Sequence, residues 1–152
     1  MSITEPPATF QPSEKCINKL CNLEGFRAYP YKDTGGLWTV GYGQRCNEHY
    51  LGPITKEVAR AWLVQKVQYI ARNLHSLMPK LLPHQVDALV LFIYNIGWDA
   101  FIHSGTCTLL KQKKTGALIK WNQWNKDEKM QIQEGLIIRR QFETQLFVYG
   151  WQ

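Results

Sequence analysis

The feature that most constrains the fold is segment 84–97, which is apolar almost all round after Asp87. A helix with apolar residues on every side needs packing partners on every side, and so belongs in the centre of a bundle. Pro83 precedes this segment and suits the first turn of a helix. We therefore expect a buried central helix with other helices packed around it.

The flanking segments predict further helices. Ser13 and Thr55 are good N-cap residues, each followed by apolar residues at helical spacing. Gly25 can end the first of these helices, and Pro79 ends the second, which is long. Shorter helices are expected over 98–103, 106–114 and 117–124, a polar loop over 125–130, and a final helix over about 136–147.

Only residues 27–43 have strand character, with a hairpin signal at 33–36, and residues 44–53 are expected to form a loop. This order predicts an α+β fold, in which a long helix joins a small hairpin-bearing N-terminal lobe to a larger helical C-terminal lobe. The 152 residues suit one domain. We expect that domain over 13–152, after a flexible lead-in over 1–12.

Three polar residues fall where this organisation would gather them. Glu24 ends the first expected helix, Asp33 opens the hairpin turn, and Thr39 lies on the strand that follows. Glycosidic hydrolysis needs two carboxyl groups around one bond, because one protonates the leaving oxygen while the other activates water or stabilises positive charge. By themselves, a Glu at a helix end and an Asp in a glycine turn are also common solvated residues.

The pattern around these residues is more specific. It reads Glu24-Gly25, then Tyr31-Lys32-Asp33, then Gly36-Leu37-Trp38-Thr39-Val40-Gly41-Tyr42-Gly43. In residue types and gaps, this block resembles the hallmark of the phage-type lysozymes, glycoside hydrolase family 24. Downstream, segment 92–97 resembles the central helix of that family, and segment 135–143 resembles its C-terminal Gly-Leu-x-x-Arg-Arg-x-x-Glu signature. The resemblance covers about residues 13–150.

The resemblance implies a lysozyme-like fold and a muramidase, which cleaves the β-1,4 bond between N-acetylmuramic acid and N-acetylglucosamine in peptidoglycan. It also implies a phage endolysin used for host lysis. Glu24 would be the general acid, Asp33 would direct the water or stabilise the oxocarbenium-like centre, and Thr39 would orient that water. The family suggests net inversion, which needs carboxyl groups about 6.5–9.5 Å apart.

Further roles are carried over in the same way. Gly43, Gln44, Tyr94 and Ser104 are expected to bind substrate. The helix period places Arg140 on the buried side of the last helix, and the resemblance makes it a candidate to reach toward Glu24. Arg139 and Glu143 are expected to form an ordinary surface pair. The chain departs from the family pattern at four positions, none of them a hallmark residue: Gln44, Gly105, Cys107 and Glu134.

The composition of the chain limits which partners it can bind and where in the cell it can act. The formal net charge is +6, and a basic surface is attracted to anionic wall polymers as well as to peptidoglycan strands. No Lys/Arg run is dense enough to predict a nucleic-acid site, and we expect a monomer. No segment approaches the roughly 18–20 apolar residues that span a bilayer, and the N-terminus lacks a signal-peptide pattern. We therefore expect the protein to stay in the host cytoplasm until its release to the wall.

The cysteines Cys16, Cys21, Cys46 and Cys107 are expected to be thiols, because a cytoplasmic chain of this size rarely forms disulfides. Their spacing does not match a zinc site, so we expect no metal and no cofactor.

Three alternatives stay open at this stage. A lytic transglycosylase would need Glu24 but not Asp33. A non-hydrolytic wall-binding or toxin-like module on the same fold would have the same sequence pattern. A basic nucleic-acid-binding helical domain would suit the charge, but it would leave the block from Glu24 to Gly43 unexplained.

Overall fold

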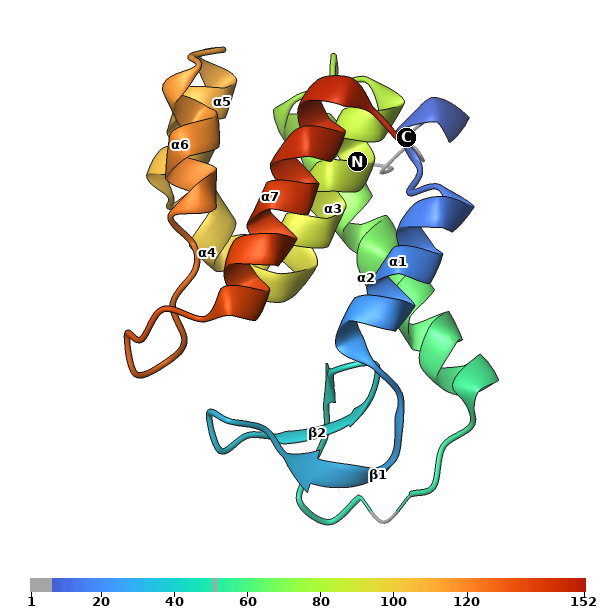
Figure 1. The fold of residues 1–152 in the computed structure, drawn as a ribbon. Helices are drawn as coiled ribbons and strands as arrows, with labels where there is room; N and C mark the ends of the chain where they lie inside the picture. The colour runs from blue at the N-terminus through green and yellow to red at the C-terminus, as the bar shows by residue number, and fades with distance from the viewer. Residues whose placement is uncertain (1–6, 51) are drawn as a thin grey trace.

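A small antiparallel sheet hangs below a group of helices in the computed structural model, which describes residues 7–50 and 52–152 (Figure 1). Residues 1–6 of the expected lead-in lie outside the described residues. The elements are a 3-10 turn η1 (Ala8–Phe10), α1 (Glu14–Glu24), β1 (Arg27–Lys32), β2 (Trp38–Gly41), β3 (Gln44–Arg45), α2 (Lys56–Leu77), α3 (Pro83–Ile96), α4 (Trp98–Ile102), α5 (Gly105–Lys111), α6 (Gly116–Asn122) and α7 (Glu134–Tyr149).

Helix α3 is the centre of the helical lobe, as predicted. It is buried continuously over residues 86–94 and packs against α1, α2, α4 and α7. Phe92 stacks on Trp121 of α6 with ring centroids 4.9 Å apart, and meets Phe101 of α4 edge-on at 6.2 Å. Helices packed around α3 thus remove its apolar residues from water on every side.

Asp87, the one acidic residue of this buried stretch, ties both ends of the domain to α3. Its Oδ1 accepts from the backbone N–H of Ser13 at 2.9 Å, and its Oδ2 accepts from the Ser13 hydroxyl at 2.5 Å. Near the C-terminus, Trp151 donates from Nε1 to the same Oδ2 at 2.8 Å. Ser13 also caps α1 as predicted, by accepting from the backbone N–H of Cys16.

The sheet is larger than predicted. Strands β1 and β2 form the expected hairpin, which the turn after Asp33 closes, but Gln44 and Arg45 continue into a third antiparallel strand. The expectation of a loop from residue 44 onward is therefore wrong for these two residues. In the register of β2 and β3, Thr39 pairs with Arg45. A strand of two residues is too short for its sequence to reveal it by alternation.

Helix α2 joins the two lobes, as predicted. It packs against β2 and β3 near its start and against α3 further along. Thr55 caps it by accepting from the backbone N–H of Val58, and the helix ends before Pro79. Within the described residues, no helix combines the length and apolar character that crossing a membrane requires.

Phe10, within the expected lead-in, is a core residue at 3% exposure and lies edge-on to His75 of α2, with ring centroids 4.8 Å apart. Contact with the core therefore begins before the expected boundary at residue 13. Throughout the described chain the cysteines are free thiols, with Cys16 and Cys107 buried and Cys21 and Cys46 partly exposed.

Candidate active site

Glu24 is the last residue of α1, and Gly25 turns the chain toward the sheet with a φ of 69°. The Glu24 side chain is 19% exposed, so its carboxylate is mostly enclosed but reachable. Its Oε1 accepts a hydrogen bond from Nη1 of Arg139 at 2.9 Å. Its Oε2 lies beside Gly43, where a Cβ atom would stand 3.2 Å away. A guanidinium therefore fixes one oxygen, while the other faces a residue without a side chain.

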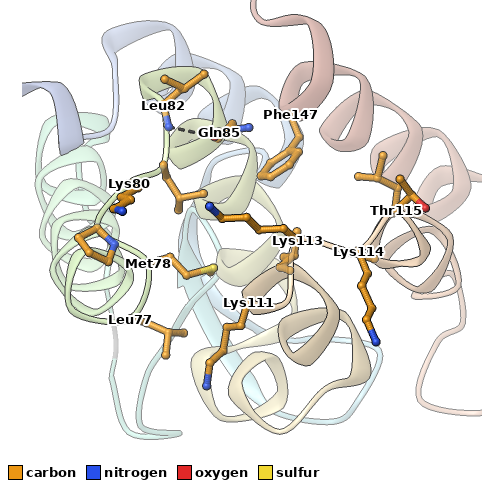
Figure 2. Close-up of a pocket in the computed structure, with 15 residues that line it drawn as sticks. Leu77, Met78, Lys80, Leu82, Gln85, Lys111, Lys113, Lys114, Thr115 and Phe147 are labelled. Atoms are coloured by element: carbon orange, nitrogen blue, oxygen red, sulfur yellow. Dashed lines mark hydrogen bonds between the residues drawn. The ribbon is translucent and has the colours of Figure 1, made fainter.

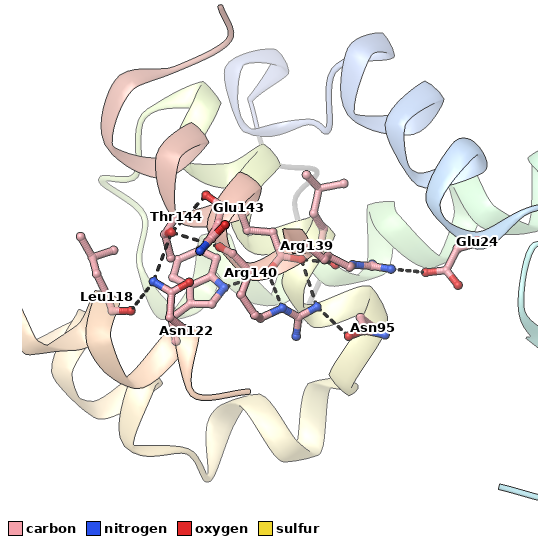
Figure 3. A network of polar contacts seen from close by, with 11 residues as sticks. Glu24, Asn95, Leu118, Asn122, Arg139, Arg140, Glu143 and Thr144 are labelled. Atoms are coloured by element: carbon pink, nitrogen blue, oxygen red, sulfur yellow. Dashed lines mark hydrogen bonds and ion pairs between the residues drawn. The ribbon is translucent and has the colours of Figure 1, made fainter. Parts of the chain in front are cut away.

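The expectation that Arg140 reaches Glu24 while Arg139 stays on the surface is wrong. Both arginines of α7 are buried, and Arg139 makes the contact (Figure 3). Arg139 also donates from Nη2 to the carbonyl of Leu91 in α3 at 2.9 Å. Since α7 packs against both α3 and α6, consecutive residues on it face different buried neighbours.

Glu143, one turn further along α7, holds both arginines and is fully buried. Its Oε2 accepts from Nε of Arg139 at 3.2 Å and from Nη2 of Arg140 at 3.1 Å. Its Oε1 accepts from Nε1 of Trp121 at 2.9 Å and forms an ion pair with Nε of Arg140, also at 2.9 Å. Arg140 further donates to Oδ1 of Asn95 at 2.6 Å. The expected surface pair of Arg139 and Glu143 is thus part of a buried network behind Glu24.

Burial sets the direction of the pKa shifts in this network. It raises the pKa of Glu143, although the guanidinium groups of Arg140 and Arg139 oppose that shift. It lowers the pKa of Arg140 to about 10, against the attraction of Glu143. The carboxyl group of Glu143 and the two guanidinium groups are buried together, so removing one partner would leave a buried charge uncompensated.

Asp33 opens the turn between β1 and β2. Its Oδ1 accepts from the backbone N–H groups of Gly35 at 3.0 Å and Leu37 at 2.9 Å, and its Oδ2 accepts from the guanidinium of Arg45. The hydrogen bond from Arg45, followed by that from Leu37, holds the pKa of Asp33 below its ordinary value of 3.8. The carboxylate is therefore ionised at neutral pH.

Thr39 is buried on β2, and its hydroxyl donates to the carbonyl of Leu37 at 3.0 Å. Nη1 of Arg45 donates to the same hydroxyl oxygen at 3.1 Å, so Arg45 joins Asp33 to Thr39. The sequence reasoning missed Arg45. No sequence signal marks it, because Arg45 reaches Thr39 through a strand of two residues, which is too short to show alternation.

Three of the expected substrate-binding residues lie near Glu24. Gly43 is close enough that an added Cβ would meet Oε2 of Glu24. Burial raises the pKa of Tyr94, and the negative charge of Glu24 raises it further. Tyr94 donates to the carbonyl of Tyr42 at 2.7 Å. Gln44 accepts from the backbone N–H of Tyr42 at 2.6 Å and donates to Tyr94 at 3.4 Å. The hydrogen bonds of Gln44 and Tyr94 therefore join the sheet region to α3.

Lys66 of α2 was also missed by the sequence reasoning. Its ammonium lies 4.4 Å from the centre of the Tyr94 ring. Partial burial lowers the pKa of Lys66, while the negative charge of Glu24 opposes that shift. The sequence alone does not distinguish a lysine of a long helix that packs beside a site from one that is exposed to solvent.

Ser104, the fourth expected substrate-binding residue, lies elsewhere in the chain, at the N-terminus of α5. It caps that helix by accepting from the backbone N–H of Cys107 at 3.0 Å, and donates to the carbonyl of Phe101 at 2.6 Å. Among the described residues, no hydrogen bond joins it to Glu24 or Asp33.

The hairpin turn touches the helical lobe on the Asp33 side. Thr34 donates to Oε1 of Glu128, in the loop between α6 and α7, at 3.2 Å. This contact links the sheet to the helical lobe, while the pair of Glu24 and Arg139 joins the end of α1 to α7. In the part of the chain that the structure describes, no three His, Cys, Asp or Glu side chains gather into a possible metal site. What this site offers is two carboxyl groups on separate elements, each held by its own arginine.

The family model for phage lysozyme matches residues 21–143 of this chain, which include Glu24, Asp33, Thr39 and the buried network of α7. The chain belongs to the phage lysozyme family. The endolysin of Acyrthosiphon pisum secondary endosymbiont phage 1 is 34% identical over 143 residues, which cover 89% of this chain and 96% of that protein.

Other relatives differ in length. The endolysin of Bacillus phage B103 is 32% identical over 146 residues, which cover 91% of this chain but 54% of that protein, so the chain spans about half the length of this relative. Among solved structures, the muramidase domain of SpmX from Asticaccaulis excentricus superimposes with a TM-score of 0.80 at 29% identity, covering 91% of this chain and 97% of that one. The predicted lysozyme-like α+β fold is thus confirmed.

Proposed function

We propose that this protein, a glycosidase-type hydrolase by family, is a muramidase that cleaves the β-1,4 bond between N-acetylmuramic acid and N-acetylglucosamine in peptidoglycan. The observation that carries the proposal is the pair of carboxyl groups on two elements, Glu24 at a helix end and Asp33 in a hairpin turn, each held by its own arginine. Membership of the phage lysozyme family supports the same chemistry.

In this proposal Glu24 is the general acid. Its Oε1 is bound by Arg139, so Oε2, beside Gly43, is the oxygen that carries the proton to the leaving group. The absence of a side chain at residue 43 leaves room there for a sugar ring. A carboxyl group with one oxygen fixed has a defined direction for proton transfer, which general acid catalysis needs.

Asp33 is the residue that directs the attacking water or stabilises the oxocarbenium-like centre. Arg45 keeps it ionised, as either role requires. Thr39 orients the water through a lone pair that remains on its hydroxyl oxygen, since that hydroxyl donates to Leu37 and accepts from Arg45. We further propose net inversion at the anomeric carbon and a role in host lysis, as in endolysins.

The sharpest test of bond and reaction type is the identity of the new chain ends. Purified peptidoglycan is digested, reduced with borohydride and hydrolysed, and the reduced amino sugars are separated. A muramidase produces muramitol. Glucosaminitol would indicate cleavage of the other glycosidic bond. A lytic transglycosylase would create no reducing end and so would give neither alditol, and its 1,6-anhydromuramoyl ends would be seen by mass spectrometry of the digest before hydrolysis. A non-hydrolytic wall-binding module would release none of these products. Proton NMR of the first products separates the α-anomer, expected for inversion, from the β-anomer.

A further inference from the structure

A hollow of about 690 Å³ lies on the helical lobe, away from the candidate active site (Figure 2). It is formed by the loop between α2 and α3, the end of α5, the start of α6 and the C-terminal half of α7. The apolar part of its lining includes Leu77, Met78, Leu81, Leu110, Leu118 and Phe147. Its volume is within the range of about 300–1,000 Å³ that small-molecule sites occupy.

This hollow is separate from the candidate active site at Glu24. Arg139, which contacts Glu24, and Phe147, which lines the hollow, are both on α7. At 1.5 Å per residue, they are about 12 Å apart along the helix axis. Figure 1 shows that the ends of α2, α5 and α7 that form the hollow point away from the sheet. A ligand in the hollow would therefore not compete with a glycan strand at Glu24.

The charged residues that line the hollow are all of one sign. Lys80, Lys111, Lys113 and Lys114 line it, and no Asp or Glu does. All four lysines are exposed. Within the described part of the chain, no ion pair joins any of them to a carboxylate. In Figure 2 the Lys113 side chain extends over the hollow, between Lys80 and Phe147.

Lys113 holds its position at a conformational cost. It lies two residues after the end of α5 with a φ of 56°, in the left-handed region. The chain turns there through hydrogen bonds from Lys113 N to Leu110 O and from Lys114 N to Leu109 O, each 3.0 Å. Glycine or asparagine is the usual residue at this position of a helix end. A lysine kept in an unfavourable conformation directs a cation over the apolar lining, and strain of this kind gathers at ligand sites.

We propose that this hollow binds an anionic phospholipid of a membrane surface, with an acyl chain against the apolar lining and the phosphodiester between the lysines. Ammonium groups form strong charge-assisted hydrogen bonds to phosphate oxygens. A wall polyanion or a nucleic acid would use the lysines but not the apolar lining. An uncharged apolar ligand would use the lining but not the lysines. An anionic lipid uses both, and the surface charge of anionic membranes attracts basic segments.

The test measures co-sedimentation of the full-length protein with lipid vesicles, which needs no enzymatic activity. The wild type should bind vesicles of mixed phosphatidylglycerol and phosphatidylcholine, and should stay in solution with phosphatidylcholine alone. Leu82 lines the hollow, is 54% exposed and occupies the N-cap of α3. Leu82→Asp supplies a favoured cap residue while placing a carboxylate at the lipid site. Its affinity for the anionic vesicles should fall at least about tenfold, with the melting temperature kept.

Matched variants separate a site from net charge. Lys111→Gln with Lys114→Gln should weaken binding by about tenfold. Lys15→Gln with Lys129→Gln, which removes the same charge from exposed positions outside the hollow, should stay within about twofold. Ile119→Asp, at a position 67% exposed and outside the lining, is the control for Leu82→Asp. Equal losses in variants and controls, full binding by Leu82→Asp, or no binding by the wild type would each overturn the proposal.

Discussion

Glu24 has two neighbours of opposite kind, the guanidinium of Arg139 on one oxygen and the backbone of Gly43 beside the other. Local chemistry predicted where Glu24, Asp33 and Thr39 fall in the fold, because each is at a marked boundary: a helix end, a glycine turn and a strand start. The roles proposed for them come from the family resemblance. Local chemistry did not locate Arg45, because that residue reaches Asp33 only through the pairing of β3 with β2.

Gly43 can be tested against a glycine of matched conformation. Gly43 and Gly36 have φ values of 80° and 79°, but an added Cβ would stand 3.2 Å from Glu24 Oε2 at residue 43 and within 4 Å of nothing at residue 36. Both alanine variants should lose about 1–2 kcal/mol of stability in denaturant unfolding, from the left-handed backbone. Only Gly43→Ala should displace Glu24 and slow peptidoglycan turnover, by about tenfold to a hundredfold. Equal turnover by the two variants would contradict this reading of the contact.

Arg45 should set the acid limb of the pH profile. Because Arg45 lowers the pKa of Asp33 below 3.8, the ionised carboxylate and its stabilising ion pair persist above that ordinary value and are lost only as the pH falls through the lowered pKa. Arg45→Ala should raise the pKa of Asp33, so turnover and acid stability should both decline at a higher pH than in the wild type. Arg45→Lys should shift the limb less. An acid limb that did not move in Arg45→Ala would remove Arg45 from this role.

At the scale of elements, the helices were predictable where a single residue marks an end. Ser13, Thr55 and Pro83 each stand at a predicted helix start, and the structure has helices beginning there. Helix α7 was predictable in extent but not in orientation. A periodicity argument assigns one face to the core, whereas α7 contacts α3, α6 and the end of α1, so Arg139 and Arg140 are both turned inward.

The two arginines of α7 should therefore both matter, in different ways. Each contacts the buried carboxylate of Glu143. Arg139→Ala and Arg140→Ala should each cost about 3–5 kcal/mol in urea unfolding, because a buried ion pair loses a partner. Arg139→Ala should also lower turnover at a temperature where both variants are folded, since Arg139 donates a hydrogen bond to Glu24 and Arg140 does not. A nearly neutral Arg139→Ala would contradict the network.

At the scale of the whole molecule, α2 joins the sheet to the helical lobe, and the residues around the candidate site have partners far away in the chain. Glu24 at the end of α1 accepts a hydrogen bond from Arg139 on α7, while Thr34 in the hairpin turn donates one to Glu128 in the loop after α6. These contacts join residues about a hundred positions apart in the chain. Local sequence patterns carry no information on such pairings, which arise only when the helical lobe assembles around α3.

The net charge of +6 acts at this same scale. It should steer the enzyme to an anionic wall, and salt screens such attraction over about 10 Å at 0.1 M. Lysis of whole walls should therefore fall as salt is added, while cleavage of a short uncharged chitooligosaccharide, where accepted as a substrate, should change much less. If both activities fell in parallel, salt would be acting on the fold or the site, and the charge would have no part in reaching the wall.

The most direct test of the central claim is the release of reducing groups from purified peptidoglycan by the wild type and by Glu24→Gln. Glutamine keeps the size of the side chain and an oxygen for Arg139, but it cannot donate a carboxylic proton. The wild type should release reducing groups steadily, and Glu24→Gln should be slower by at least about a hundredfold, the low end for general acid catalysis, with an unchanged melting temperature. Turnover by Glu24→Gln within a few-fold of the wild type would contradict the assignment of Glu24 as the general acid.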